Sequence, residues 1–493
     1  MARSSRVTLK RCFGLKESIT ITVGTVIGVG LFTIGGNVVG LLGPLVIWAT
    51  FAALLISIYP ALLYAEMGAA LPLAGGTYQY ASLGLGRPFG MLAGWNFIIA
   101  MVSVASGEAL AFSFYIRTFF AALGVNLPLN DSGIACLVII LFLILGIRGI
   151  KITGRLQNGF MFFFWGVAVV WVISLLPSIS TANFIPAATT GFSVSGFIPC
   201  IALIWWCFAG FETCCALGEE IRYPQINLPR ALILAPFIVF AVNGLFQWAL
   251  LSIVPSAGLP LLIDAAAPYA EAMKQAGIIG FPLLLLCLGI ALGGDFSTLN
   301  ATIAASSRYL FTMARDGVLP QFFMRLHTRY RTPVFAILLL GALVLLLVST
   351  NSITYIASLS LFATLFYYII GIVAACFLRR KKPNLPRPFT APLIWLGAPL
   401  SALIYLYMMT QLDKGAILAG LIWCGCGLLI YVIQSCRGAL ANSADSSFYL
   451  GATPESPTPA EKRQMDREYR RCSIAVGFAV IFVIALYLIA FLL

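Results

Sequence analysis

The sequence predicts an all-α integral membrane protein: an inverted five-span repeat (5+5) with broken spans 1 and 6, plus three further C-terminal spans. Hydrophobic residues make up 61% of the chain, charged residues only 10%, and the mean hydropathy is +0.99. Soluble domains carry about 25% charged residues, so this composition describes a membrane protein. Apolar runs of about 20 residues, enough to cross a bilayer, recur along the whole chain. Two of these runs, five spans apart, are interrupted by glycine.

The apolar runs define the predicted spans, which cover residues 18–38, 44–70, 90–120, 132–148, 156–178, 197–218, 231–254, 278–305, 334–350, 353–377, 391–411, 416–436 and 473–493. Every lysine and arginine except Arg117, Lys274 and Lys414 then falls on one side, which is the positive-inside pattern. This pattern predicts a multi-pass protein of the plasma (inner) membrane, with a cytoplasmic N-terminus and the C-terminus on the opposite face. It also accounts for the net charge of +13 without a nucleic acid partner.

The spans group into six predicted segments. These are a cytoplasmic leader (1–17), the first repeat (18–178), the second, inverted repeat (197–377), spans 11 and 12 (391–436), a cytoplasmic linker (437–472) and an extra C-terminal span (473–493). The linker is polar and contains three prolines, so we expect a mobile tether. The extra span is almost entirely apolar, and we expect it to be peripheral and lipid-facing.

The first span contains Gly24, Gly28 and Gly30 in its middle. In lipid every backbone N–H and C=O needs a partner, so a helix break at this depth is tolerated only beside protein or a water-filled cavity. A broken span presents the positive N-terminal end of one half-helix and the carbonyl end of the other. These two ends suit an α-carboxylate and an α-ammonium lying side by side. The alternative is that the glycines only allow close helix packing.

The sixth span is the second interrupted one, with Gly210 and Glu212 in the run Trp-Trp-Cys-Phe-Ala-Gly-Phe-Glu at 205–212. Glycine-interrupted spans at matching positions of two halves are the best sequence pointer to the binding site of a transporter with inverted repeats. Two such spans meeting at mid-membrane would enclose a small polar site in an otherwise apolar protein. Transport is therefore the leading interpretation.

Several motifs occur in an order that is similar to the amino acid/polyamine/organocation (APC) family of permeases. They are 27–32 (Ile-Gly-Val-Gly-Leu-Phe), 65–66, 75–80, 94–95, 208–212, 219–231, 307–317 and 379–389. The resemblance extends from about residue 14 to 390 and implies an amino acid or amine permease. Val29 departs from the family's usual serine, which removes a hydroxyl but leaves the backbone N–H.

The resemblance implies that backbone groups at the two breaks bind the substrate: N–H groups of 29–31 hold the carboxylate, and carbonyls of both breaks hold the ammonium. The candidate substrate-binding residues are Thr25, Val26, Gly28, Val29, Gly30, Leu31, Glu108, Trp206, Cys207, Ala209 and Ser360. Trp206 matches an aromatic residue that closes over the substrate in related exchangers, and it is also a candidate gating residue. The alternative is an aromatic that only packs in the helix bundle.

Apart from Glu66 near the cytoplasmic end of span 2, three carboxylates lie within predicted spans, where each charge costs at least about 2.5–3.5 kcal/mol. Glu212 follows the second break. It would be a proton-linked group or, in the interpretation we favour, would support the unwound backbone by accepting its N–H groups. Glu108, near the middle of span 3, would meet a second positive charge on the substrate or form a hydrogen-bonded carboxyl between helices. Asp295, toward the outer half of span 8, would attract cations into a vestibule or cap a kinked helix. Glu108 and Asp295 together favour a cationic substrate such as arginine, ornithine, lysine or a diamine.

The coupling mechanism stays open at this point. Several family branches place a lysine on span 5 that stands in for a sodium ion, and alignment puts Phe164 at that position. The protein would then be an exchanger that needs no driving ion. Alternatively, a sodium ion would sit between span 1 carbonyls and the hydroxyls of Ser306 and Ser307, although ordinary helix hydroxyls are the favoured explanation for these serines.

Other functional classes have less support. No metal site or cofactor is expected, because the sole histidine, His327, lies in a loop and the spans contain no serine–histidine pair. The sequence predicts a non-enzymatic secondary transporter that exchanges or symports cationic amino acids or polyamines by alternating access. The alternatives are a proton- or sodium-coupled symporter of neutral amino acids and a non-transporting amino acid sensor on the same fold. The lipid bilayer is the other expected partner, and the oligomeric state is not defined.

Overall fold

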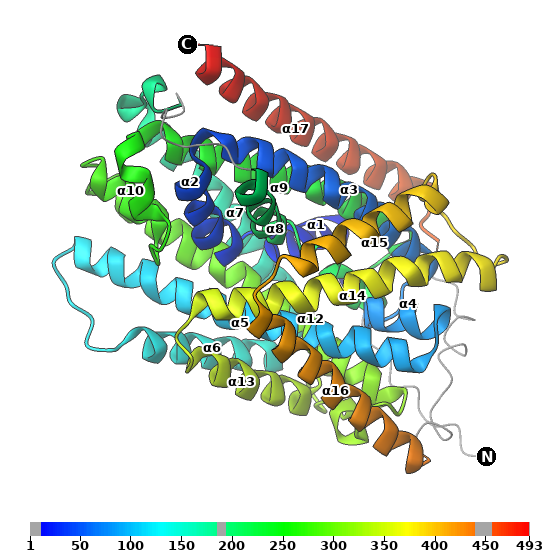
Figure 1. Cartoon of the computed structure of the whole chain (residues 1–493). Coiled ribbons are helices and arrows are strands. Elements are labelled where there is room, and N and C mark those ends of the chain that lie inside the picture. The colour runs from blue at the N-terminus through cyan, green and yellow to red at the C-terminus, as the bar shows by residue number, and fades with distance from the viewer. Residues whose placement is uncertain (1–10, 185–193, 439–455, 493) are drawn as a thin grey trace.

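The computed structural model describes residues 11–184, 194–438 and 456–492, and this part of the chain is helical without any β-strand. Figure 1 shows long helices lying side by side in one bundle. Ten helical stretches among the described residues are long and apolar enough to cross a membrane, and the shorter apolar helices Val334–Val348 and Ile394–Thr410 accompany them. The predicted all-α membrane fold class is confirmed.

The helices coincide with the predicted spans in order. The first span is α1 (Leu15–Gly24), η1 (Gly30–Gly35) and α2 (Gly36–Leu42); the next four are α3 (Val46–Ala70), α5 (Arg87–Ala122), α6 (Asp131–Arg148) and α7 (Ile150–Leu175). The sixth span is α8 (Val194–Trp206) with η5 (Phe211–Ala216), the seventh is α9 (Pro224–Ile253), and the eighth is α11 (Phe281–Leu288), η8 (Gly289–Asp295) and α12 (Phe296–Arg315). The remaining spans are α13 (Val334–Val348), α14 (Ile353–Lys381), α15 (Ile394–Thr410), α16 (Lys414–Cys436) and α17 (Pro459–Leu492). The short helices α4 (Gly76–Gly84), η6 (Gly218–Glu220) and α10 (Pro268–Gln275) lie between spans.

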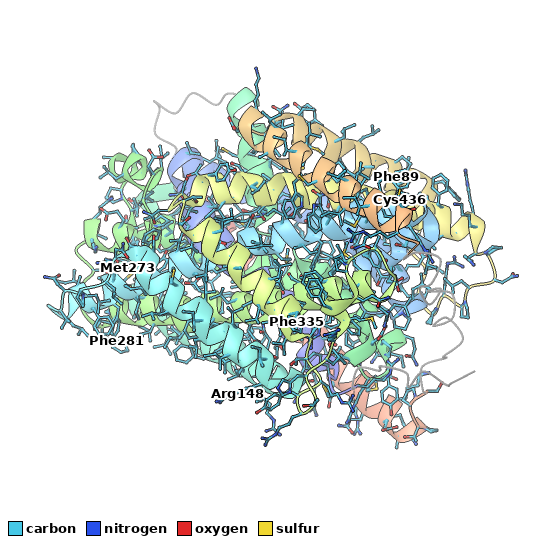
Figure 2. All side chains as sticks on the ribbon, turned by 90° about the horizontal axis from the view of Figure 1, so that it is seen from below. Phe89, Arg148, Met273, Phe281, Phe335 and Cys436 are labelled. Carbon is cyan, nitrogen blue, oxygen red and sulfur yellow. The ribbon has the colours of Figure 1, made fainter. Side chains whose placement is uncertain are left out.

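The core of the bundle is centred on α5, which packs against α4, α12 and α14, while α3 packs along α9. Buried aromatic and aliphatic side chains of these helices form one continuous cluster. The outer helices instead expose apolar side chains, such as Leu396 at 68% and Phe478 at 70%, as a lipid-facing surface requires. Figure 2 shows Phe89 and Cys436 at one end of the bundle and Met273 and Phe281 at the other. These four residues, which the sequence places near opposite membrane faces, thus lie at opposite ends of the bundle.

The C-terminal helix differs from the prediction. Residues 459–472, predicted as part of a mobile linker, form the first turns of α17, whereas 439–455 of that linker lie outside the described residues. The helix begins earlier because Thr458 and Glu461 form a capping box: the Thr458 N–H donates to the Glu461 carboxylate at 2.9 Å and the Glu461 N–H donates to the Thr458 hydroxyl at 3.3 Å. Arg230 of α9 pairs with Asp466, and α17 lies along one edge of the molecule (Figure 1). The predicted peripheral position of the last span is observed.

Candidate functional site

The first span is broken between α1 and η1, as predicted. Within the described residues, the backbone N–H groups of Gly30 and Leu31 donate to no protein acceptor, because they start a new helical segment. The carbonyls of Thr25 and Val26, where α1 ends, accept no hydrogen bond from that part of the chain. The break therefore offers free donors on one side and free acceptors on the other.

The sixth span is broken after α8. Gly210 has φ +105°, a left-handed conformation that side chains other than glycine rarely adopt, and this turn separates α8 from η5. The carbonyls of Cys207 and Ala209 accept no hydrogen bond from the described residues, whereas the Trp206 carbonyl accepts the Ala209 N–H at 3.1 Å. Of the three predicted acceptors on this span, two are therefore free.

The two breaks are in contact. The Cys207 thiol donates to the Gly30 carbonyl at 3.0 Å, and a Cβ added at Gly210 would lie 3.3 Å from the Thr25 side chain. Thr25, Val29 and Trp206 are all buried, the last with 6% of its surface exposed. The free backbone groups of both spans thus surround one buried point of the bundle, which the structure holds in a closed arrangement.

Glu108 of α5 lies directly against the first break. Both of its carboxylate oxygens accept the Val29 N–H, at 2.9 and 3.0 Å, and the side chain is 1% exposed. This contact requires a glycine next to Val29, because a Cβ at Gly28 would lie 2.2 Å from a Glu108 oxygen. The predicted carboxylate-binding set must therefore be corrected: Val29 is already occupied by a protein carboxylate, and only Gly30 and Leu31 remain free.

Asp295 does not lie in an outer vestibule. It ends η8 with none of its surface exposed, and because η8 packs against α5 its carboxyl group lies beside that of Glu108. Neither of its oxygens accepts a hydrogen bond from an N–H or hydroxyl donor of the described residues. The predicted vestibule and helix-capping roles are both replaced by a Glu108–Asp295 pair beside the first break.

Trp206 and Glu212 flank the second break. The Trp206 indole N–H donates to the Ser360 hydroxyl at 3.2 Å, which places Ser360 beside the predicted aromatic gate. Glu212 accepts hydrogen bonds from the hydroxyls of Tyr367 and Tyr368. The Tyr368 hydroxyl also accepts the Gly210 N–H at 3.1 Å, so Glu212 and Tyr368 together hold the left-handed turn. Sequence reasoning missed both tyrosines, although two adjacent tyrosines inside a span are an unusual polar signal.

Replacing Tyr368 with phenylalanine should lower the initial rate of substrate uptake about five- to a hundredfold. The change leaves the Gly210 N–H and one oxygen of Glu212 without this buried partner, and an unsatisfied buried polar group costs about 1–3 kcal/mol. Tyr355→Phe, at a position of the same helix that is 42% exposed, is the matched control and should transport normally. Wild-type uptake by Tyr368→Phe would contradict a supporting role for this hydroxyl.

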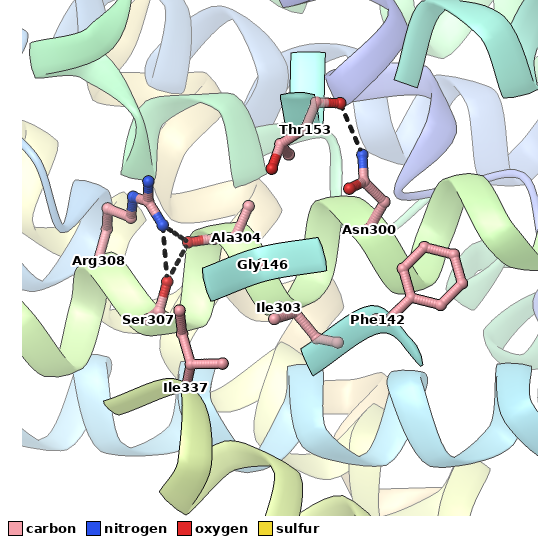
Figure 3. A pocket seen from close by; sticks show the side chains of 9 residues that line it. All are labelled: Phe142, Gly146, Thr153, Asn300, Ile303, Ala304, Ser307, Arg308 and Ile337. Atoms are coloured by element: carbon pink, nitrogen blue, oxygen red, sulfur yellow. Dashed lines mark hydrogen bonds between the residues drawn. The ribbon is translucent and has the colours of Figure 1, made fainter. Parts of the chain in front are cut away.

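Ser297 and Thr298 provide the hydroxyl groups that contact the Gly24 and Ile27 carbonyls at the first break. The Thr298 hydroxyl lies 2.8 Å from the Gly24 carbonyl and 3.1 Å from the Ile27 carbonyl. Ser307 lies about two and a half turns beyond Thr298 on α12, about 13 Å along its axis. There it donates to the Ala304 carbonyl at 2.8 Å and accepts from Arg308 at 2.9 Å (Figure 3). The predicted ion site at Ser306 and Ser307 is therefore not adjacent to the first break.

Asn158 of α7 contacts Glu17 and Thr20 of α1, and the fully buried polar side chain beside it that faces span 1 is that of Gln157. Its amide donates to the Thr20 carbonyl at 3.0 Å and to the Ser297 hydroxyl at 2.7 Å. Phe164, the position aligned with the family's lysine, instead packs edge-on against Phe32 with ring centroids 5.6 Å apart. A neutral amide therefore bridges spans 1, 5 and 8, and the aligned position lies in an aromatic cluster.

Ion pairs tie the loops together at the end of the bundle that holds α4 and η6. Arg308 pairs with Glu220 at 3.0 Å, with both side chains buried, and Arg315 pairs with Glu219 at 3.1 Å. Glu66 pairs with Arg379. Burial raises the pKa of the Glu220 carboxyl, and the Arg308 guanidinium partly offsets this shift. Charged residues from four different segments are thus paired with one another at this end of the bundle.

Comparison with known proteins agrees with this architecture. A family model described as amino acid permease matches residues 13–417. The chain is 24% identical over 455 residues to the branched-chain amino acid permease BcaP of Bacillus subtilis, covering 90% of this chain and 96% of the relative. It is 29% identical to BcaP of Lactococcus lactis, with 84% and 92% coverage, and 25% identical to the vacuolar cationic amino acid transporter 8 of Arabidopsis thaliana, with 80% and 67% coverage. With its broken spans and this match over most of its length, the chain belongs to the amino acid permeases of the APC family, which are multi-pass membrane transporters and not enzymes.

Proposed function

We propose that this amino acid transporter works by alternating access, with the substrate's α-carboxylate and α-ammonium bound between the two breaks. The observation that carries this proposal is the set of free backbone groups at one buried point. The N–H groups of Gly30 and Leu31 would hold the carboxylate, and the carbonyls of Thr25, Val26, Cys207 and Ala209 would hold the ammonium. Leaving these buried polar groups without hydrogen-bond partners is unfavourable, so a zwitterion that hydrogen-bonds to them would bind favourably.

We further propose that the broken spans head two inverted repeats, 18–178 and 197–377. The protein would lie in the plasma membrane with a cytoplasmic N-terminus. Matching interruptions in the first and sixth spans and the one-sided distribution of lysine and arginine support this arrangement.

The proposed substrates are cationic amino acids or polyamines. Glu108 and Asp295 place two carboxyl groups beside the first break, and the described residues provide no lysine or arginine that pairs with either. A second positive charge on the substrate would compensate these groups. One relative is named as a cationic amino acid transporter.

A second candidate is the transport of neutral amino acids coupled to an ion. It is favoured by the engagement of Glu108 with the Val29 N–H, which gives this carboxyl group a protein partner without any substrate charge. Two relatives are named as branched-chain amino acid permeases.

Uptake into proteoliposomes separates these candidates. Vesicles holding the purified protein would be given radiolabelled arginine, putrescine or leucine, with or without internal substrate and with or without proton and sodium gradients. Arginine or putrescine uptake that needs internal substrate and ignores both gradients would support cationic exchange. Gradient-driven leucine accumulation that arginine does not inhibit would overturn the cationic proposal. Binding of amino acids without any uptake would indicate a sensor.

A further inference from the structure

The Glu108–Asp295 pair has no assigned role beyond its position beside the substrate. We infer that these two carboxyl groups form one proton-binding site, and that the second positive charge of a cationic substrate displaces the proton. The proton-binding site does not depend on the proposed function, whereas the displacement of the proton rests on the proposed cationic substrate.

The two carboxyl groups differ in their hydrogen-bond partners. Both oxygens of Glu108 accept the Val29 N–H, which belongs to the positive end of the half-helix that begins at the break. Asp295 receives no donor from the described residues, and its polar neighbour is the Glu108 carboxyl. The environment therefore stabilises negative charge on Glu108 and provides nothing comparable for Asp295.

Within the described part of the chain, no basic residue compensates the pair. The ion pairs of the described residues leave out both carboxyl groups. Tyr115 of α5 is a further titratable group near Asp295, and a tyrosine hydroxyl is uncharged at neutral pH. Both carboxyl groups are also at most 1% exposed, so water does not compensate them either.

Two adjacent carboxylates in such a place cannot both be ionised. A single charge in a membrane interior already costs at least about 2.5–3.5 kcal/mol, and a like charge in contact adds repulsion. One proton between the groups removes both problems, since Asp295 then donates a hydrogen bond to the Glu108 carboxylate. The arrangement becomes a chain in which protonated Asp295 and the Val29 N–H both donate to Glu108.

A substrate ammonium or guanidinium would replace that proton. As the cation approaches Glu108, the positive charge next to the pair would favour the loss of the Asp295 proton to water. The cation would keep all of its own protons, so one proton is released for each cationic substrate bound. A neutral amino acid brings no such charge and would leave the proton in place. In either case one positive charge would compensate the pair: the bound proton when the substrate is neutral, and the second charge of the substrate when it is cationic.

Infrared difference spectroscopy of the reconstituted protein tests this inference directly. We expect a protonated-carboxyl band in wild-type protein at neutral pH that is lost in Asp295→Asn and shifted in frequency in Glu108→Gln, where the Asp295 carboxyl group keeps its proton but loses the carboxylate that accepts its hydrogen bond. The control is Glu212→Gln, which removes a different buried carboxyl group and should keep the band. Saturating arginine should remove the band from wild-type protein, whereas leucine should not.

The outcomes separate the two halves of the inference from the proposed function. A wild-type spectrum without a band that depends on both residues overturns the proton site, whatever the protein transports. A band that persists while arginine is transported overturns the displacement but not the site. A band that persists in a protein that neither binds nor transports arginine overturns the cationic substrate and leaves the proton site supported. Should Asp295→Asn fail to fold, Asp295→Ser and Glu108→Gln provide the same comparison.

Discussion

Replacing Gly28 with alanine is expected to lower arginine uptake about ten- to a hundredfold. The added Cβ would lie 2.2 Å from one Glu108 oxygen, and the buried carboxylate would have to leave the Val29 N–H to make room. A hydrogen bond to a charged group contributes about 1.5–3 kcal/mol, and each 1.4 kcal/mol corresponds to a factor of ten. The measurement is the initial uptake rate in proteoliposomes, normalised to the amount of folded protein.

Gly107→Ala is the matched control for this experiment. Gly107 precedes Glu108 on α5, but its added Cβ would lie 3.4 Å from the nearest atom, a methyl carbon of Val29, which is an ordinary contact. This variant should therefore transport at close to the wild-type rate. Equal losses in both variants would show that any methyl group at this interface is harmful, and a normal rate for Gly28→Ala would contradict the role of the Glu108–Val29 contact.

Replacing Arg308 with methionine is expected to destabilise the protein by about 3–5 kcal/mol, because it leaves the buried Glu220 carboxylate without its partner. The pair is bidentate, with N–O distances of 3.0 and 3.1 Å, and both side chains are nearly inaccessible to water. Thermal unfolding in detergent should therefore show a clearly lower midpoint. Uptake at a temperature where the variant is still folded distinguishes lost stability from lost transport.

Two further variants sharpen this test. The double variant Arg308→Met, Glu220→Leu removes both charges and should recover most of the lost stability, since apolar pairs often replace buried ion pairs without loss. Arg117→Met breaks a pair in which the arginine is 37% exposed, and it should lower stability by less than about 1 kcal/mol. The buried pair would not be important for stability if Arg308→Met unfolded at the wild-type temperature.

The sequence by itself determined the membrane fold, the order of the spans and the place of the two breaks. Long apolar runs can cross a bilayer only as helices, so hydropathy alone defines α3, α5 or α14. The glycines at 24–30 and at 210 identified the interruptions because only special backbone environments tolerate them at that depth. The capping residues Thr458 and Glu461 were also readable in the sequence, yet the prolines before them favoured a linker.

Only the tertiary structure decided which side chains meet at the breaks. Glu108 and Asp295 lie nearly two hundred residues apart, and hydropathy does not define how α5 and η8 are rotated against each other. Gln157 and Phe164 lie two turns apart on one face of α7 and both meet span 1, so only the depth at which the helices cross decides that the amide reaches the Thr20 carbonyl while the ring packs against Phe32. Rotation of α12 explains why Thr298 rather than Ser307 reaches the carbonyls at the first break. A helix presents a different side chain every 100°, so a shift of one or two residues in an expected contact changes a polar neighbour into a lipid-facing or aromatic one.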